Sequence, residues 1–242
     1  MQPYICKILP KRGNRYEPFL FFWGFISWIA EESVKRGIEK LYFFTREGEF
    51  FKKLYDEWRA CSPYKAKMPP AQVLEVSRMS VFLPSMPNIS VSACMRMWIQ
   101  YSEQSMEAFC KTLSVDIRLF EDLFCEYGIR RQEVIKKPWT DVRIRNLFQD
   151  REFCKRLKQQ RDVKRCLLYA YLEQKGFSQT DMGKIGVVDI GWRGGIQDSL
   201  CLLYPHSTIT GFYIGLQPFL VKQPDNAIKC GYIDSYRKMS LC

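Results

Sequence analysis

Apolar residues follow two different spacings along this chain, and the two spacings alternate. Short, nearly continuous apolar runs between turn residues are typical of strands buried on both faces of a parallel sheet. Four such runs occupy residues 38–45, 72–76, 185–190 and 209–216, and a weaker one occupies 228–233. Because helical segments separate the runs, the pattern predicts an α/β fold with a mostly parallel sheet of about four or five strands, flanked by helices.

Spacing of about 3.6 residues predicts helices over much of the rest. One helix is expected from Pro18, which suits a first helical turn, to about Arg36, with Gly37 as its C-cap. Residues 49–60 form a second helical pattern, and residues 196–204 form a third. From about 90 to 176 the pattern is helical throughout. We therefore expect an α/β core made of residues 1–89 and 177–242, with an all-helical insertion, 90–176, between strands two and three.

Composition restricts the class of protein. Apolar residues make up 47% of the 242 residues, which is too many for a disordered chain and enough for a full core. The longest apolar stretch, 19–30, is shorter than the roughly 20 residues that span a bilayer. Ten cysteines without a CxxC pair, and a single histidine, argue against a zinc site. Without a secretory signal we expect a cytoplasmic protein, and peripheral contact with the inner membrane stays open.

Net charge is +11, and the excess is concentrated between residues 143 and 165. A basic run on a helix is usually a solvated face, and it also fits a phosphate-rich partner such as an anionic membrane surface. No nucleic-acid-binding motif accompanies the run, so nucleic acid is not an expected partner. The basic residues are Arg143, Arg145, Arg151, Lys155, Arg156, Lys158, Arg161, Lys164 and Arg165.

The segment 184–197, KIGVVDIGWRGGIQ, carries the strongest chemical signal. Its apolar run ends in one acid, Asp189, and a turn with Gly191, Gly194 and Gly195 leads into a helical pattern. Glycine lets a ligand approach the backbone closely, and open α/β sheets bind ligands at the carboxyl ends of their strands. The segment therefore predicts a ligand site. The alternative is a tight strand-to-helix connection in which Asp189 is only a cap.

Polar turns follow the first three predicted strands, and parallel strands would bring these turns to one edge of the sheet. Arginine side chains at that edge can bind phosphate or carboxylate groups through paired hydrogen bonds. Asp189 can bind hydroxyls or a metal, or act as a general base. The alternative is that Arg46 and Arg78 pair with Glu47, Glu75 or Asp189 and only hold the loops. With Asp189 as the catalytic candidate, the substrate-binding candidates are Arg46, Glu47, Gly48, Ser77, Arg78, Gly191, Trp192, Arg193, Gly194, Gly195 and Gln197.

Several common enzyme motifs are missing. The sequence contains no GxGxxG, GxxxxGK[ST], GxSxG or HExxH. These absences argue against a Rossmann dehydrogenase, a P-loop NTPase, an α/β-hydrolase and a zinc protease.

Motifs along the chain resemble a bacterial family. They are LYFFTREGEFF at 41–51, EVSR at 75–78, VVDIGWRGGIQDSL at 187–200 and ITGFYIGL at 209–216. In this order they resemble the carboxyl-terminal module of predicted hydrolases of the haloacid dehalogenase (HAD) superfamily, which are associated with glycosyltransferases in surface-polysaccharide gene clusters. The family's first turn is usually Arg-Asp-Gly, where this chain has Arg46-Glu47-Gly48, and Gly195 stands where a threonine is common.

The hydrolase chemistry of that superfamily does not follow from the resemblance. A HAD phosphatase needs an Asp nucleophile with a second Asp two residues later, and no DxD occurs in this sequence. The resemblance therefore implies the partner module without the hydrolase half, and we expect no HAD-type phosphatase activity. Residues 187–196 are also similar to the acidic strand end and phosphate loop of type I phosphoribosyltransferases. Those loops carry two adjacent acids, whereas only Asp189 is acidic here.

Together these observations predict a module of bacterial surface-polysaccharide biosynthesis that binds a phosphorylated sugar, a nucleotide sugar or a glycan intermediate. Arg46 and Arg78 would hold the phosphate, and Trp192 would stack on a sugar or base. Whether the chain is an enzyme stays open; if it is one, a transferase or hydrolase is expected. No cofactor is required, and Mg²⁺ stays an option. The alternatives are a phosphoribosyltransferase-like enzyme, and a non-catalytic module that docks on a glycosyltransferase or an anionic membrane.

Overall fold

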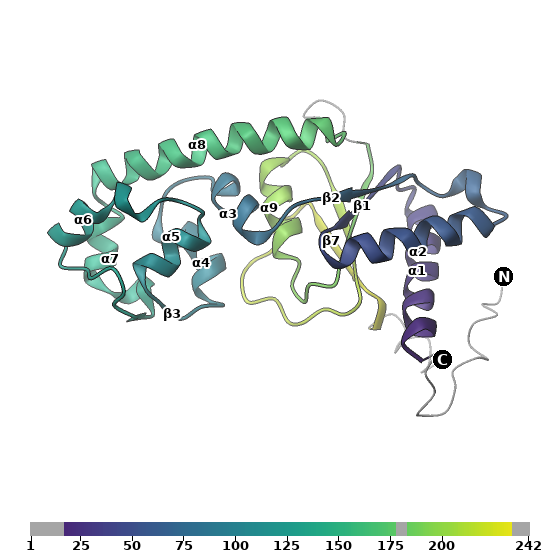
Figure 1. The fold of residues 1–242 in the computed structure, drawn as a ribbon, viewed down its shortest axis with the longest axis horizontal. Helices are drawn as coiled ribbons and strands as arrows, with labels where there is room; N and C mark the ends of the chain where they lie inside the picture. The colour runs from purple at the N-terminus through teal and green to yellow at the C-terminus, as the bar shows by residue number, and fades with distance from the viewer. Residues whose placement is uncertain (1–16, 178–182, 234–242) are drawn as a thin grey trace.

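A computed structural model describes residues 17–177 and 183–233. Its main sheet has five parallel strands in the order β2-β1-β5-β6-β7, which confirms the predicted α/β class (Figure 1). Strands two and three of the prediction are therefore not neighbours, because β1 lies between them. The strands are β1 (Lys40–Phe44), β2 (Ala71–Leu74), β5 (Ile185–Asp189), β6 (Ile209–Tyr213) and β7 (Ala227–Gly231).

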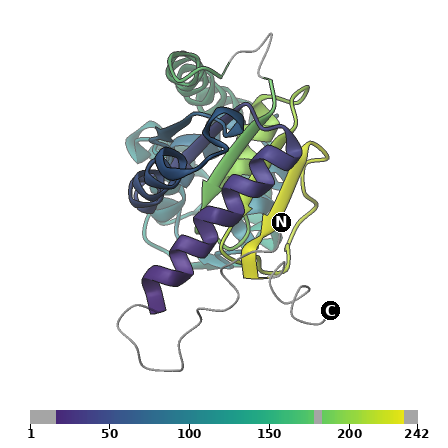
Figure 2. The same cartoon turned by 90° about the vertical axis from the view of Figure 1, so that its right-hand side faces the viewer.

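Helices cover both faces of this sheet. Side chains alternate along a strand, so Leu41 and Phe43 pack against one layer while Tyr42 and Phe44 pack against the other. The first layer is α1 (Glu17–Arg36) with α2 (Glu47–Cys61), and Figure 2 shows α1 lying over one face of the sheet. The second layer contains α3 (Arg78–Ser85), α9 (Gly195–Leu203) and the end of α8 (Arg151–Gln174).

A second hydrophobic core lies in the chain between β2 and β5. Trp98, Phe109 and Phe153 are fully buried in it and contact a shared neighbour, Phe148. We call this part the helical module. The prediction of an all-helical segment differs from the structure in one detail, because β3 (Glu103–Gln104) and β4 (Ile135–Lys136) pair antiparallel. A ladder two residues long leaves no periodic pattern in a sequence. The remaining helices are α4 (Val91–Trp98), α5 (Met106–Thr112), α6 (Glu121–Glu126) and α7 (Val142–Leu147), with short 3₁₀ turns at Lys65–Lys67, Ile117–Leu119 and Pro138–Thr140.

The long helix α8 belongs to both cores. Phe153 and Leu157 near its start are buried in the helical module, whereas Leu168 and Leu172 near its end are buried against the sheet. Along the top of the molecule in Figure 1 it therefore holds the two cores together. The sequence pattern predicts a continuous helix across the residues that form α7 and α8. The helix restarts because the Asp150 carboxylate accepts a hydrogen bond from the Phe153 amide at 2.7 Å.

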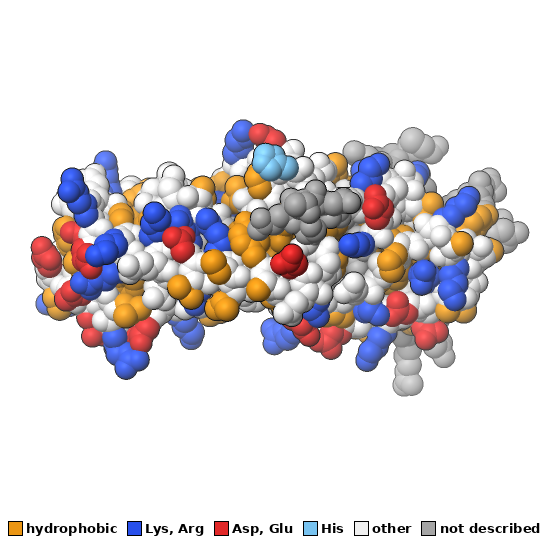
Figure 3. Space-filling view, turned by 90° about the horizontal axis from the view of Figure 1, so that it is seen from above, with side chains coloured by type: hydrophobic (Ala, Val, Ile, Leu, Met, Phe, Trp, Pro, Cys, Tyr) orange, Lys and Arg blue, Asp and Glu red, His pale blue; other side chains and the backbone are white. Residues whose placement is uncertain are grey.

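Much of the basic run between residues 143 and 165 is used inside the protein. Arg161 is only 6% exposed and donates to the Pro87 carbonyl at 3.1 Å, and Arg165 donates to the Pro84 carbonyl at 2.6 Å. Arg143 pairs with Glu133 at 2.8 Å. The prediction of a solvated basic face therefore holds for only part of the run. Seen from the α8 side in Figure 3, basic side chains alternate with acidic and hydrophobic ones.

The apolar stretch 19–30 lies within α1, where Phe25, Ile26 and Ile29 are buried in the core on the α1 side of the sheet. Within residues 17–177 and 183–233, no helix is both long and apolar enough to cross a membrane.

Candidate functional site

The strand order places a crevice between β1 and β5. From β1 the chain continues into α2 on one face of the sheet, and from β5 it continues into α9 on the other face. Such a reversal opens a crevice at the carboxyl ends of the two strands, which is where open α/β sheets bind ligands. Glu47 begins α2 and Asp189 ends β5, so both acids lie at this crevice.

Asp189 is a half-buried acid whose ionisation is opposed by its surroundings. Burial raises the pKa of its carboxyl group, and the nearby charge of Glu47 raises it further. Backbone hydrogen bonds from Gly191 and Ile190 and the charge of Arg78 act in the opposite direction. The Gly191 backbone passes so close that a Cβ there would lie 2.5 Å from Asp189 Oδ2. A carboxylate with a raised pKa is a better base than an ordinary aspartate.

We expect Asp189→Asn to stabilise the protein at neutral pH. A raised pKa in the folded state means that folding favours the protonated acid, so stability is lost as pH rises from about 3.9 through the folded-state pKa. Asparagine removes that loss and still accepts the backbone hydrogen bonds. In urea unfolding, the variant's advantage should be largest at pH 7, amounting to about 1.4 kcal/mol per unit of the pKa shift, and should vanish below pH 4.

The matched control is Asp225→Asn, because Asp225 forms an exposed ion pair with Lys222 at 3.4 Å, with an Asp225 side chain that is 89% exposed. This control should leave the unfolding midpoint unchanged at both pH values. An Asp189→Asn protein that is less stable than the parent at pH 7 would show that the ionised carboxylate holds the turn together.

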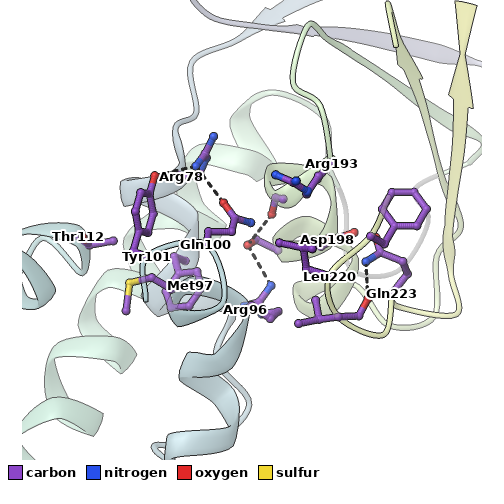
Figure 4. Close-up of a pocket in the computed structure, with 15 residues that line it drawn as sticks. Arg78, Arg96, Met97, Gln100, Tyr101, Thr112, Arg193, Asp198, Leu220 and Gln223 are labelled. Carbon is purple, nitrogen blue, oxygen red and sulfur yellow. Dashed lines mark hydrogen bonds between the residues drawn. The ribbon is translucent and has the colours of Figure 1, made fainter. Parts of the chain in front are cut away.

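A pocket adjoins the crevice, between the helical module and the first turn of α9 (Figure 4). Three arginines border it, and each comes from a different element. Arg78 is the first residue of α3, Arg96 lies on α4, and Arg193 lies in the turn before α9. Arg78 therefore belongs to both places, since its charge also acts on Asp189.

Neutral groups hold two of these arginines in place. Arg78 Nη1 donates to the Tyr101 hydroxyl at 3.0 Å and to Gln100 Oε1 at 3.3 Å. Arg193 Nε donates to the Pro218 carbonyl at 3.2 Å. These partners orient the guanidinium groups and leave their charge uncompensated.

Arg96 is the most enclosed of the three. Its Nη2 donates to Ser85 Oγ at 3.0 Å, its Nη1 lies 3.4 Å from Ser199 Oγ, and its guanidinium lies 4.9 Å from the centre of the Phe82 ring. Burial lowers the pKa of Arg96, an effect that the charge of Asp198 opposes. Among the residues that the structure describes, none of the three arginines forms an ion pair.

Asp198, the one carboxylate that the described residues place on the pocket wall, already has a cationic partner. Lys229 Nζ lies 2.6 Å from Asp198 Oδ1, and the two side chains are 4% and 9% exposed respectively. The same ammonium donates to the Arg193 carbonyl at 2.7 Å and to Gln223. Asp198 therefore balances Lys229, and the arginine charges remain for a ligand.

Gly194 and Gly195 stand at the start of α9, and the absence of a side chain has a different consequence at each. Gly194 has φ of +67°, and a Cβ there would lie 2.5 Å from the Tyr213 hydroxyl. Gly195 lines the pocket, and a Cβ on it would have no atom within 4 Å. Gly194 is thus required by the backbone and by packing, while Gly195 leaves the pocket open beside the first turn of the helix.

The structure separates the predicted site residues into groups. It brings Glu47, Arg78 and Asp189 together at the crevice, with Gly191 beside them. Arg193 and Gly195 line the adjoining pocket.

Other predicted residues lie at the surface or have structural partners. Arg46 is exposed at the start of α2, and Trp192 is 54% exposed. Ser77 caps α3 by accepting from the Ser80 amide. Gly48 is buried where a Cβ would lie 2.8 Å from the Phe43 backbone, so it allows α2 to pack on β1.

The structure gives Gln197, one of the predicted substrate-binding residues, a structural role. Gln197 is fully buried, and its amide nitrogen donates to the carbonyls of Ile209 at 2.8 Å and Ile228 at 2.9 Å. Its oxygen accepts from the Tyr213 hydroxyl at 2.6 Å. The side chain spans strands β6 and β7 beneath the helix, so none of its hydrogen-bonding groups is available to a ligand.

Arg96, Ser199 and Phe219 line the pocket and were missed from the sequence. One signal was available for Arg96, which stands between Met95 and Met97 in an otherwise apolar helical stretch. A charge in such a position needs polar partners when the helix packs, and these partners come from elements far away in the chain. No comparable signal marks Phe219, which lies in an irregular loop after β6.

No cluster of three or more His, Cys, Asp or Glu side chains suited to a metal occurs within residues 17–177 and 183–233. Comparison of the sequence with protein-family models and with curated proteins finds no match. The functional argument therefore rests on the geometry of the crevice and the pocket.

Proposed function

We propose that this protein binds a phosphorylated sugar, a nucleotide sugar or a phosphate-bearing glycan intermediate at the carboxyl edge of its sheet. The supporting observation is the set of three arginines that border one pocket and form no ion pair with any residue that the structure describes. Like charges repel at close range, so gathering them costs free energy unless an anion neutralises them in the working protein. Guanidinium forks bind phosphate, as they bind carboxylate, through two parallel hydrogen bonds.

The crevice supplies the chemistry that a sugar phosphate needs next to its anion. Asp189 and Glu47 offer carboxylate oxygens, which accept hydrogen bonds from sugar hydroxyls. The raised pKa of Asp189 also suits it to remove a proton from a hydroxyl group. In this proposal the arginines hold the phosphate, and Asp189 orients a hydroxyl or activates it for transfer.

We propose a role in surface-polysaccharide biosynthesis because the motifs at 41–51, 75–78 and 187–200 resemble those of proteins associated with that process. Those motifs contribute Glu47, Arg78, Asp189 and Arg193 to the site described above. The residues that carry the resemblance thus supply several of the charged groups of the site, which is why we keep the two proposals together.

We expect purified protein to bind UDP-glucose or glucose 1-phosphate in isothermal titration calorimetry at low salt. Arg193→Gln should weaken that binding about 10- to 100-fold, because a charge-assisted hydrogen bond contributes about 1.5–3 kcal/mol. The half-exposed position of Arg193 makes the variant compatible with folding. Added salt should weaken binding to the parent protein more steeply than binding to the variant.

Arg145→Gln provides the matched control, because Arg145 is an exposed arginine on α7 that does not line the pocket. It removes the same charge from the protein. Because salt screens a charge that lies outside the pocket, the affinity should stay within about twofold of that of the parent protein. Equal losses in the two variants would mean that net charge, and not the pocket, attracts the ligand.

A further inference from the structure

The pocket and the crevice offer different chemistry to the two ends of a ligand. Apolar side chains from two sides form much of the pocket wall, with Phe82 and Met97 on the helical module and Phe219, Leu220 and Val221 on the loop after β6. The crevice instead offers the carboxylates of Asp189 and Glu47. Arg78 borders the pocket and its charge acts on Asp189, so this residue is common to the pocket and the crevice.

A sugar ring does not match the pocket. Its hydroxyls need several hydrogen-bond partners, and carboxylates are the strongest acceptors for them. Among the described residues, the only carboxylate on the pocket wall is Asp198, which is ion-paired with Lys229 at 2.6 Å. The free carboxylates lie in the crevice, and that is where the structure best accommodates a sugar.

A flat ring system does match the pocket. Phe219 and Leu220 are 43% and 45% exposed, so they present apolar surface on which a ring can stack. Gln100 also lines the pocket, and its amide nitrogen, which has no hydrogen-bond partner among the described residues, can donate to the edge of a base. Thr112 and Gln223 line the pocket too, but they already donate to the carbonyls of Ala108 and Val221. An alkyl tail would displace water from the polar groups of the pocket and offer them no hydrogen bond in return. The lining therefore favours a nucleobase over a lipid.

We infer that the ligand is a nucleoside diphosphate sugar, bound with its nucleoside against the apolar wall, its phosphates among the three arginines and its sugar at the Asp189 crevice. This inference rests on the proposed function and narrows its substrate class. It assigns Phe219 and Leu220 to nucleoside binding, a role that no motif in the sequence indicates.

The test compares probes that each contain one part of such a ligand. Calorimetry would measure the affinities of ADP, CDP, GDP and UDP, of inorganic pyrophosphate, of glucose 1-phosphate and of farnesyl diphosphate. At least one nucleoside diphosphate should bind about tenfold or more tightly than pyrophosphate, since stacking a base on an aromatic ring has an effect of this size. The double variant Phe219→Ala/Leu220→Ser should remove that advantage and leave pyrophosphate binding unchanged.

Phe19→Ala is the control for loss of an exposed aromatic ring, because Phe19 lies on α1, is 51% exposed and does not line the pocket. It should leave every affinity unchanged. If glucose 1-phosphate binds in an Arg193-dependent way and no nucleoside diphosphate exceeds pyrophosphate, the nucleoside inference is overturned and the proposed function stands. Tighter binding of farnesyl diphosphate than of all four nucleotides also overturns it, in favour of a lipid carrier. If no probe binds, both proposals are overturned.

Discussion

Lys229→Met should destabilise the protein by about 3–5 kcal/mol, measured as the free energy of unfolding in urea. The substitution leaves Asp198 buried without its cationic partner, at a position where that side chain is only 9% exposed. It also removes the hydrogen bond to the Arg193 carbonyl at 2.7 Å, which fastens the turn before α9. A buried unpaired charge costs far more than the pair itself contributes, and this asymmetry sets the size of the effect.

The double variant Lys229→Met/Asp198→Leu separates the charge effect from packing. Removing both ionic groups should restore most of the lost stability, because a buried ion pair can often be replaced by apolar side chains of similar volume. Lys222→Met is the surface control, since its pair with Asp225 is exposed and should contribute less than about 1 kcal/mol. A single variant Lys229→Met within 1 kcal/mol of the parent would mean that Asp198 is neutral in the folded protein.

The second large effect is expected at two adjacent glycines, with opposite signs. Gly194→Ala should destabilise the protein by about 2–5 kcal/mol, because the left-handed φ of +67° strains an alanine and its Cβ would lie 2.5 Å from the Tyr213 hydroxyl. Gly195→Ala should instead stabilise by up to about 1 kcal/mol, because this residue begins α9 and its Cβ meets open space. Both values are differences in unfolding free energy measured in urea.

A larger side chain at Gly195 tests whether a ligand binds in the pocket. Gly195→Leu would extend into the open space that Gly195 leaves, so it should block ligand binding while the protein stays folded. Gly195→Ala is its control for the change of backbone. If Gly195→Leu binds UDP-glucose or glucose 1-phosphate as tightly as Gly195→Ala, the first turn of α9 does not face the ligand.

The order of elements and the character of the strands followed from the sequence alone. Apolar runs predicted the positions of β1, β2, β5, β6 and β7 to within a few residues, because strands buried on both faces cannot include many polar side chains. The predicted fourth strand continued past Tyr213 because Ile214 is also apolar and packs against the core after the strand has ended. The sequence likewise identified Asp189 as an acid at a strand end.

The arrangement in space depended on the tertiary structure. The strand order, with β1 between β2 and β5, creates the crevice that brings Glu47 near Asp189, and the apolar pattern of separate strands carries no information on which strand pairs with which. The pocket needs a further contact, between Arg96 on α4 and Ser199 on α9. These residues are far apart in the chain and meet because α3 and α8, which pack against each other, hold the helical module beside α9.

Gln197 shows why the sequence alone does not separate a residue that faces a ligand from one that holds the fold together. In the sequence it follows a glycine-rich turn at a strand end, as a ligand-binding residue does, and its polarity agrees with that role. In the fold, the first turn of α9 directs it toward the sheet, where the carbonyls of Ile209 and Ile228 and the Tyr213 hydroxyl occupy its hydrogen-bonding groups. The sequence determined which polar residues lie beside the strand ends, and only packing decided which of them face a ligand and which satisfy the buried backbone.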